Sequence, residues 1–149
     1  MIRYNNDYNH GAHPEILRAF LETNDNAYGG YGKDEWCECA KTEIKKYLGD
    51  VNADIHFVVG GTQANLIVIA SALRPFESVI SADSGHINVH ETGAIEATGH
   101  KVLALPHHEG KLCPEEVRAY VKSFYEEEAF EHMVFPGMVY ISHPTEYGT

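Results

Sequence analysis

The sequence has few cysteines, and their spacing does not suit a metal ribbon. Cys37, Cys39 and Cys113 are the three cysteines among 149 residues, and no two of them form a C-x-x-C pair. An odd number of cysteines without that spacing argues against a disulfide framework and against a zinc ribbon. We therefore expect reduced thiols in a cytoplasmic protein.

Basic residues and long apolar runs are also scarce. Lysine and arginine number 11 against 22 acidic residues, which gives a formal net charge of −11. Such a charge repels nucleic-acid backbones and anionic membranes. The most apolar run, Leu66 to Leu73, is far shorter than the ~20 residues of a membrane-spanning helix, and the amino terminus lacks the apolar core of a signal peptide. We expect neither nucleic acid nor membrane as a partner.

Helical and strand-like segments alternate along the chain. Proline at a first helical turn or glycine after a last turn marks several of the helices. The pattern predicts helices from Pro14, over 34–48, over 60–74, near 87–98 and from Pro114, and strands at 55–59, 78–82, 101–105 and 138–142. Strands that alternate with helices indicate an α/β protein of three layers, with a mostly parallel sheet and ligands at the carboxyl ends of its strands.

A glycine turn between a predicted strand and a helix is the first candidate site. Gly60, Gly61 and Thr62 directly precede the helical run, so backbone N–H groups, a hydroxyl and the positive end of the helix meet there. Such a place suits a phosphate group. It matches neither a Walker A loop nor G-x-G-x-x-G, and a tight turn in which Thr62 caps the helix is the alternative.

A pair of histidines follows the predicted strand at 78–82. His86 and His90 are four residues apart, with Glu91 directly after them, and on a helix both rings would lie on one face, as two zinc ligands do. No third ligand is evident. Because this segment also lies at a strand end, one ring can instead face the aromatic part of a phosphorylated ligand, and His90 can simply pack.

Six motifs together resemble those of a known family. In order along the chain they are NNDYNHGAHPEIL, GGYGKDEW, VVGGTQANL, ADSGHINVHETGA, ATGHKV and MVYISHPTEYGT. The chain resembles the low-specificity threonine aldolases, which are beta-eliminating lyases that depend on pyridoxal 5'-phosphate and have the aspartate aminotransferase fold. The resemblance implies a helical segment with an active-site loop at 1–49 and the first half of the cofactor-binding large domain at 50–149.

The resemblance also implies roles for single residues. By position, Gly61 and Thr62 bind the cofactor phosphate, and His86 stacks on the pyridine ring and helps to move protons. Glu91 matches an acidic catalytic residue. Tyr31 matches a tyrosine beside the active site at a subunit boundary. Asn6 stands where relatives often carry a serine that holds the substrate carboxylate.

Other positions depart from the family pattern. Thr145 stands where many relatives have a histidine proposed as a base, and His143 lies two residues earlier. Pyridoxal chemistry also needs a lysine that binds the cofactor and a carboxylate beside the pyridine nitrogen, and the seven lysines here lack the expected context. We expect the amino-terminal part of a larger enzyme, inactive alone, which forms a homodimer or homotetramer when complete.

The resemblance predicts a lyase that cleaves a β-hydroxy-α-amino acid, such as threonine, into glycine and an aldehyde. Beta-elimination and transamination on the same fold are close alternatives, because the bond that breaks depends on how the substrate is oriented. A metal-dependent hydrolase built on His86 and His90, or a non-catalytic binding domain, is the alternative of another class.

Overall fold

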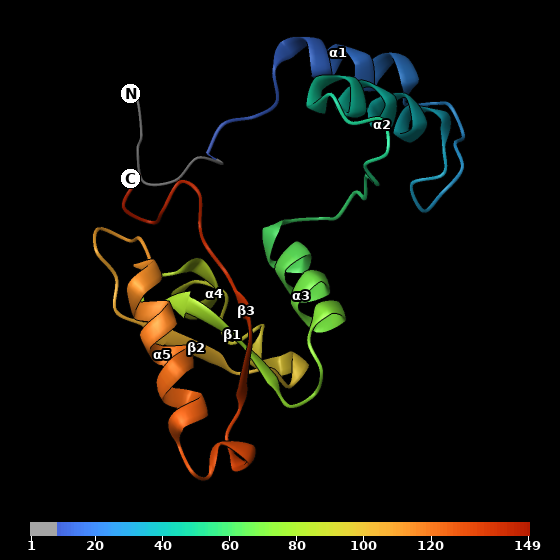
Figure 1. Cartoon of the computed structure of the whole chain (residues 1–149). Coiled ribbons are helices and arrows are strands. Elements are labelled where there is room, and N and C mark those ends of the chain that lie inside the picture. Colours follow the sequence, from blue (N-terminus) through green and yellow to red (C-terminus); the bar gives the residue numbers. More distant parts are fainter. Residues whose placement is uncertain (1–8) are drawn as a thin grey trace. The chain divides into compact units, whose positions relative to one another are not determined.

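The computed structural model describes residues 9–149 and contains two compact units (Figure 1). The chain divides after Phe57, so the units are Met1–Phe57 and Val58–Thr149. Within the described residues no helix combines the length and the apolar character needed to cross a bilayer. The organisation into 1–49 and 50–149 stays a prediction about the complete protein.

The first unit contains two helices with local start and stop signals. Helix α1 is Pro14–Thr23 and helix α2 is Glu35–Leu48. The Asp34 side chain caps α2 by accepting a hydrogen bond of 2.9 Å from the backbone N–H of Cys37. Gly49 ends α2 in the left-handed conformation, with φ 69°. Both helices confirm the sequence prediction, because caps of this kind depend only on neighbouring residues.

The second unit is an α/β unit with an all-parallel sheet. Strand β1 lies in the centre, in the order β2-β1-β3, and both of its neighbours run parallel to it (Figure 1). The elements in chain order are α3 (Gly61–Ala72), β1 (Glu77–Ala82), α4 (His86–Val89), the 3-10 turn η1 (Glu96–Thr98), β2 (Val102–Leu105), α5 (Pro114–Glu126), the 3-10 turn η2 (Phe130–His132) and β3 (Phe135–Val139).

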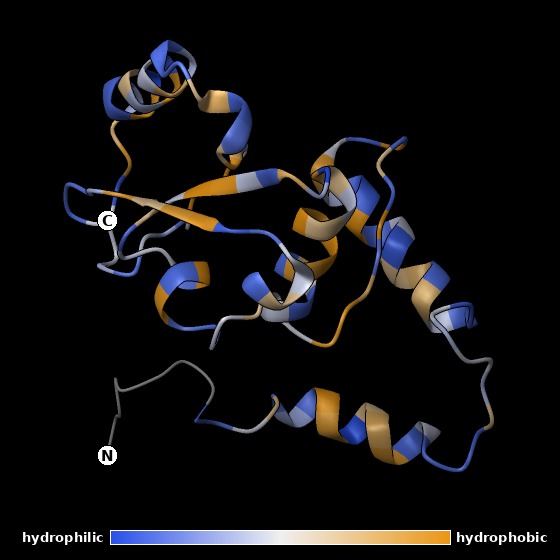
Figure 2. Cartoon of the chain, turned by 90° about the horizontal axis from the view of Figure 1, so that it is seen from below, coloured by the Kyte–Doolittle hydropathy of each residue, from blue (hydrophilic) through white to orange (hydrophobic). Residues whose placement is uncertain are grey.

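The core of this unit surrounds the central strand. In Figure 2 the hydrophobic colour runs along the strands of the sheet. Val79 of β1 is wholly buried and clusters with Ile69 of α3 and Ile87 of α4. Phe124 of α5 packs edge-on against Phe135 of β3, with 5.1 Å between ring centroids. Helices α3, α4 and α5 are thereby anchored to the sheet, which fixes the residues that follow the ends of its strands.

Two predicted strands are confirmed, and a third is shifted. Strand β1 matches the prediction at 78–82, and β2 matches the one at 101–105. Strand β3 begins at Phe135, three residues before the predicted start, because Phe135 pairs with Glu77 at the beginning of β1. The backbone N–H of Tyr140 still donates to Ile80 at 2.8 Å, so contact with β1 continues beyond the end of β3.

The strand predicted at 55–59 is wrong. These residues adopt no strand conformation, and the exposed fractions of Phe57 and Val59 are 48% and 96%. A strand requires a neighbour for its backbone hydrogen bonds, and the described sheet consists of three strands that do not include this segment. An apolar, β-branched run was therefore not sufficient to form a strand.

The prediction of one continuous helix near 87–98 is also wrong. The segment forms α4 and η1, which are separated by a turn at Thr92 and Gly93. Both residues have positive φ, 52° and 75°, a conformation that a right-handed helix excludes. As a result Glu91 lies outside helix α4, on the turn that follows it.

Candidate active site

The amino terminus of α3 is open, as a phosphate site requires. Helix α3 begins at Gly61, and no side chain among the described residues caps its first N–H groups. Thr62 is the second helical residue, so it does not act as the cap that the alternative interpretation assigned to it. A Cβ added at Gly60 or Gly61 would meet no atom within 4 Å. Free N–H groups with open space before them fit a phosphate group.

His86 is the first residue of α4, and the buried Glu91 holds its ring. The two side chains meet through His86 Nδ1 and Glu91 Oε1, which are 2.8 Å apart. The His86 side chain is 43% exposed, whereas the Glu91 side chain is 0% exposed. A carboxylate only accepts hydrogen bonds, so Nδ1 carries the proton. Nearly half of the His86 side chain thus remains accessible while Glu91 holds Nδ1.

Asn65 connects this pair to the start of α3. Its Nδ2 donates to Glu91 Oε1 at 2.6 Å. Asn65 follows Gly61 by four residues, which places the two on the same face of α3, about 6 Å apart along the helix axis. Sequence reasoning missed Asn65, although its spacing from the glycine turn was a usable signal. One carboxylate thus joins His86 to helix α3, at a residue four positions beyond Gly61 of the predicted phosphate turn.

A tight turn at the end of β1 sets the position of His86. The turn follows Ala82, and its Gly85 donates a backbone hydrogen bond of 2.8 Å to the Ala82 carbonyl. A Cβ on Gly85 would collide with the Ser81 hydroxyl oxygen and would lie 3.0 Å from the Ala82 carbonyl oxygen. This close approach explains why glycine precedes the histidine.

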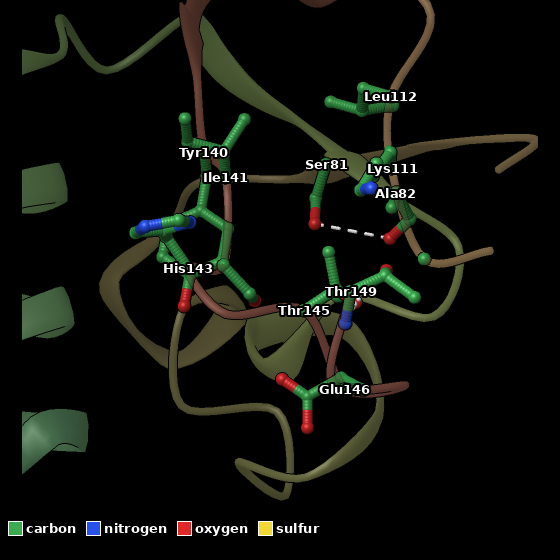
Figure 3. Close-up of a pocket in the computed structure, with 13 residues that line it drawn as sticks. Ser81, Ala82, Lys111, Leu112, Tyr140, Ile141, His143, Thr145, Glu146 and Thr149 are labelled. Atoms are coloured by element: carbon green, nitrogen blue, oxygen red, sulfur yellow. Dashed lines mark hydrogen bonds between the residues drawn. The ribbon is translucent and has the colours of Figure 1, made fainter. Parts of the chain in front are cut away.

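A pocket of about 300 Å³ adjoins this turn at the carboxyl ends of β1 and β3. Figure 3 shows Ser81, Tyr140 and Thr145 among its lining residues. His143 also lines it, so Thr145, which departs from the family pattern, and the nearby His143 face the same space as Gly85. The position of the pocket agrees with the rule that parallel α/β sheets bind ligands at the carboxyl ends of their strands.

The remaining predicted residues lie elsewhere. His90 is exposed at the end of α4, with its ring centroid 5.5 Å from that of His86. Residues 9–149 contain no group of three or more histidine, cysteine or acidic side chains arranged to hold a metal ion. Tyr31 is in the first unit, fully exposed and with a positive φ of 62°. Asn6 lies outside the described residues.

Most of the chain is similar to proteins of a known family. Residues 14–145 match the family described as beta-eliminating lyase. Low-specificity L-threonine aldolases of Pseudomonas aeruginosa and of a Pseudomonas strain are 29% identical over 141 residues, which is 93% of this chain and 39% of theirs.

A solved structure of Leishmania major threonine aldolase is also similar. It shares 48% sequence identity with this chain and superposes with a TM-score of 0.87 over 95% of the chain and 40% of its own length. The chain thus spans about 40% of the length of the relatives that it matches. Its fold is accordingly a partial α/β domain of the pyridoxal-phosphate-dependent transferase fold, as the sequence predicted. The chain belongs to the beta-eliminating lyase family.

Proposed function

We propose that the complete protein is a pyridoxal-phosphate-dependent lyase that cleaves a β-hydroxy-α-amino acid, such as threonine, into glycine and an aldehyde. One observation carries the proposal: buried Glu91 holds the half-exposed ring of His86 and is bonded to the helix whose free amino terminus suits a phosphate. The similarity to threonine aldolases supports the choice of substrate class.

The first residues of α3 and the His86 ring fit the cofactor. Gly61 and Thr62 would hold its phosphate, because their N–H groups lie in the first turn of α3 and the space before the turn is open. His86 would lie against its flat ring. When bound, the cofactor supplies an electron-withdrawing ring that accepts the electron pair released as a bond to the substrate Cα breaks.

His86 and Glu91 would also control a proton. Glu91 accepts the hydrogen bond from Nδ1, which keeps the lone pair of a neutral imidazole on Nε2. Because the His86 side chain is 43% exposed, Nε2 would be able to take up or release a proton at a bound substrate. Burial of the Glu91 side chain excludes water from the contact with Nδ1.

Two further residues would bind the amino acid substrate. The amide of Asn6 can donate a hydrogen bond to the substrate carboxylate. Tyr31 is fully exposed in the structure and has a backbone conformation that is uncommon for a tyrosine. Strained residues of this kind occur at functional sites. We assign Tyr31 to the edge of the active site at a subunit boundary of a homodimer or homotetramer.

The proposal is tested with the complete gene product, purified with pyridoxal phosphate and supplied with threonine. We expect a yellow protein that forms glycine and acetaldehyde in equal amounts. A matched reaction with alanine, which has no β-hydroxyl group, controls for cleavage between Cα and Cβ and should give no glycine.

Other products would identify the alternatives. Release of ammonia and a keto acid would indicate β-elimination, a reaction that the family description itself favours, and would reject the aldolase reaction while keeping the cofactor. An amino-group transfer to a keto acid would indicate an aminotransferase. A colourless protein that binds one equivalent of zinc and never takes up pyridoxal phosphate would reject both the reaction and the cofactor.

A further inference from the structure

Glu91 is an unusual carboxylate because one of its oxygens makes both of its hydrogen bonds. Oε1 accepts from Asn65 Nδ2 at 2.6 Å and contacts His86 Nδ1 at 2.8 Å. Oε2 is buried and has no partner in the described part of the chain. A buried carboxylate is stable only when hydrogen bonds compensate for its lost hydration. The two donors at Oε1 must therefore compensate for the burial of the whole Glu91 carboxylate.

The chemistry of the three groups fixes which atom carries each proton. A carboxylate accepts but does not donate, so Asn65 must turn its NH₂ group toward Glu91, and His86 must present a protonated Nδ1. Asn65 is the donor whose protons do not titrate, whereas the imidazole can lose or move its own. The Asn65 amide is thus the constant contact that holds Glu91 Oε1 beside His86 Nδ1.

From this geometry we infer that Asn65 is a positioning residue: through Glu91 it keeps the His86 ring proton on Nδ1 and leaves Nε2 free. The catalytic role of a free Nε2 rests on the proposed function. The hydrogen bonds among Asn65, Glu91 and His86 do not depend on it. The Asn65 amide bonds to Glu91 rather than to His86, so it acts on the ring through Glu91. It also fixes the start of α3 relative to α4.

Loss of the Asn65 donor should change the tautomer of His86. Without it, the Glu91 side chain loses one of the two contacts that hold Oε1 against His86 Nδ1, so the hydrogen bond that fixes the ring proton is weakened. The tautomer of a neutral imidazole follows the hydrogen bonds of its two nitrogens, so the single ring proton moves from Nδ1 to Nε2 when the contact at Nδ1 is lost. The tautomer is therefore a readout that a merely structural role for Asn65 would not alter.

The test is solid-state NMR of the full-length, cofactor-free protein labelled with ¹⁵N-histidine, at a pH of about 8, where an ordinary histidine is neutral. The His86 signal is identified by its loss in His86→Gln. We expect the Nδ1–H form in the wild-type protein and the Nε2–H form in Asn65→Leu, which removes the donor at similar volume. Asn65→Ala, which adds no bulk, should behave in the same way and serves if the leucine variant does not fold.

Asn88→Leu is the matched control. Asn88 lies in α4 beside His86, and its amide donates at 2.7 Å to the Asp83 carbonyl rather than to Glu91. This variant should keep the Nδ1–H form. The inference is overturned if folded Asn65 variants keep the wild-type tautomer, if Asn88→Leu changes it equally, or if the wild-type ring carries its proton on Nε2.

Catalysis gives a second, separate readout. In the complete enzyme Asn65→Leu should lower kcat about 10- to 100-fold, as expected from the loss of a hydrogen bond to a charged group, with KM nearly unchanged. An unchanged kcat would overturn the role in catalysis. A tautomer change in a protein that cleaves no β-hydroxy amino acid would confirm the positioning by Asn65 and reject the proposed function.

Discussion

Replacing Gly85 with alanine tests whether close packing of the turn after β1 holds His86 in place. Gly85 has φ −62° and ψ 146°, a backbone conformation that alanine adopts freely. Any destabilisation must therefore come from the added Cβ. That atom would overlap the Ser81 hydroxyl oxygen and would lie 3.0 Å from the Ala82 carbonyl oxygen.

The expected loss of stability follows from these contacts. Overpacking a well-packed interior costs about 1–3 kcal/mol. Ser81 is wholly buried, and its hydroxyl donates to the Ala82 carbonyl at 3.1 Å, so rotation of the side chain would also break a hydrogen bond worth about 1 kcal/mol. Alanine also restricts the unfolded chain, which offsets about 0.4–1 kcal/mol of this loss of stability. We expect Gly85→Ala to lower the free energy of unfolding by about 1–3 kcal/mol, the net of these effects.

Urea unfolding followed by circular dichroism measures this change, with Gly11→Ala as the matched control. A Cβ at Gly11 meets no atom within 4 Å, so this variant should stay within about 0.5 kcal/mol of the parent. In the double variant Ser81→Ala/Gly85→Ala the collision with the hydroxyl is absent, and part of the loss should be recovered. If Gly85→Ala were as stable as Gly11→Ala, or if Ser81→Ala recovered nothing, the packing argument would be wrong.

Three further predictions concern the histidine, the lysines and the cysteines. His86→Ala in the complete enzyme should weaken cofactor retention and slow catalysis by about 10²- to 10⁴-fold; an unchanged absorbance spectrum and rate would remove His86 from the site. Borohydride treatment of the 149-residue chain with pyridoxal phosphate should label no single lysine specifically, and peptide mapping that finds one specific pyridoxyl-lysine would contradict this. Hydrogen bonding to Asp34 raises the pKa of the Cys37 thiol, so at pH 8 iodoacetamide should alkylate Cys37 more slowly than the exposed Cys39. Asp34→Ala should narrow the difference between the two alkylation rates. Equal rates in the parent protein would refute the effect of Asp34 on the Cys37 thiol.

Elements with local signals were predictable from the sequence. Pro14 and Gly49 set a helix start and a helix end because proline and glycine restrict the backbone wherever they stand. Strand β1 was predictable because a central parallel strand is buried on both faces, and the small and β-branched residues from Ser78 to Ala82 suit such a place. The family resemblance rested on short motifs, and the comparisons confirm the family.

The site was predictable in its main residues but not in how they are joined. Sequence reasoning placed His86 at the end of β1 because the apolar strand stops just before it, and the structure places it there. It put His86, His90 and Glu91 on one helix, whereas the positive φ of Thr92 places Glu91 on a turn. The contact of Asn65 with Glu91 spans 26 positions, and spacing within one helix does not report such a contact.

The sequence by itself determined the helix caps, the central strand and the family, because these depend on backbone restrictions and on short runs of residues. Tertiary structure decided which apolar run pairs as a strand, since 55–59 has the composition of a strand but no place in the described sheet. It also decided that one buried carboxylate serves both Asn65 and His86. The physical reason is that strand pairing and buried hydrogen bonds need a partner from a distant part of the chain, and only the folded chain supplies that partner.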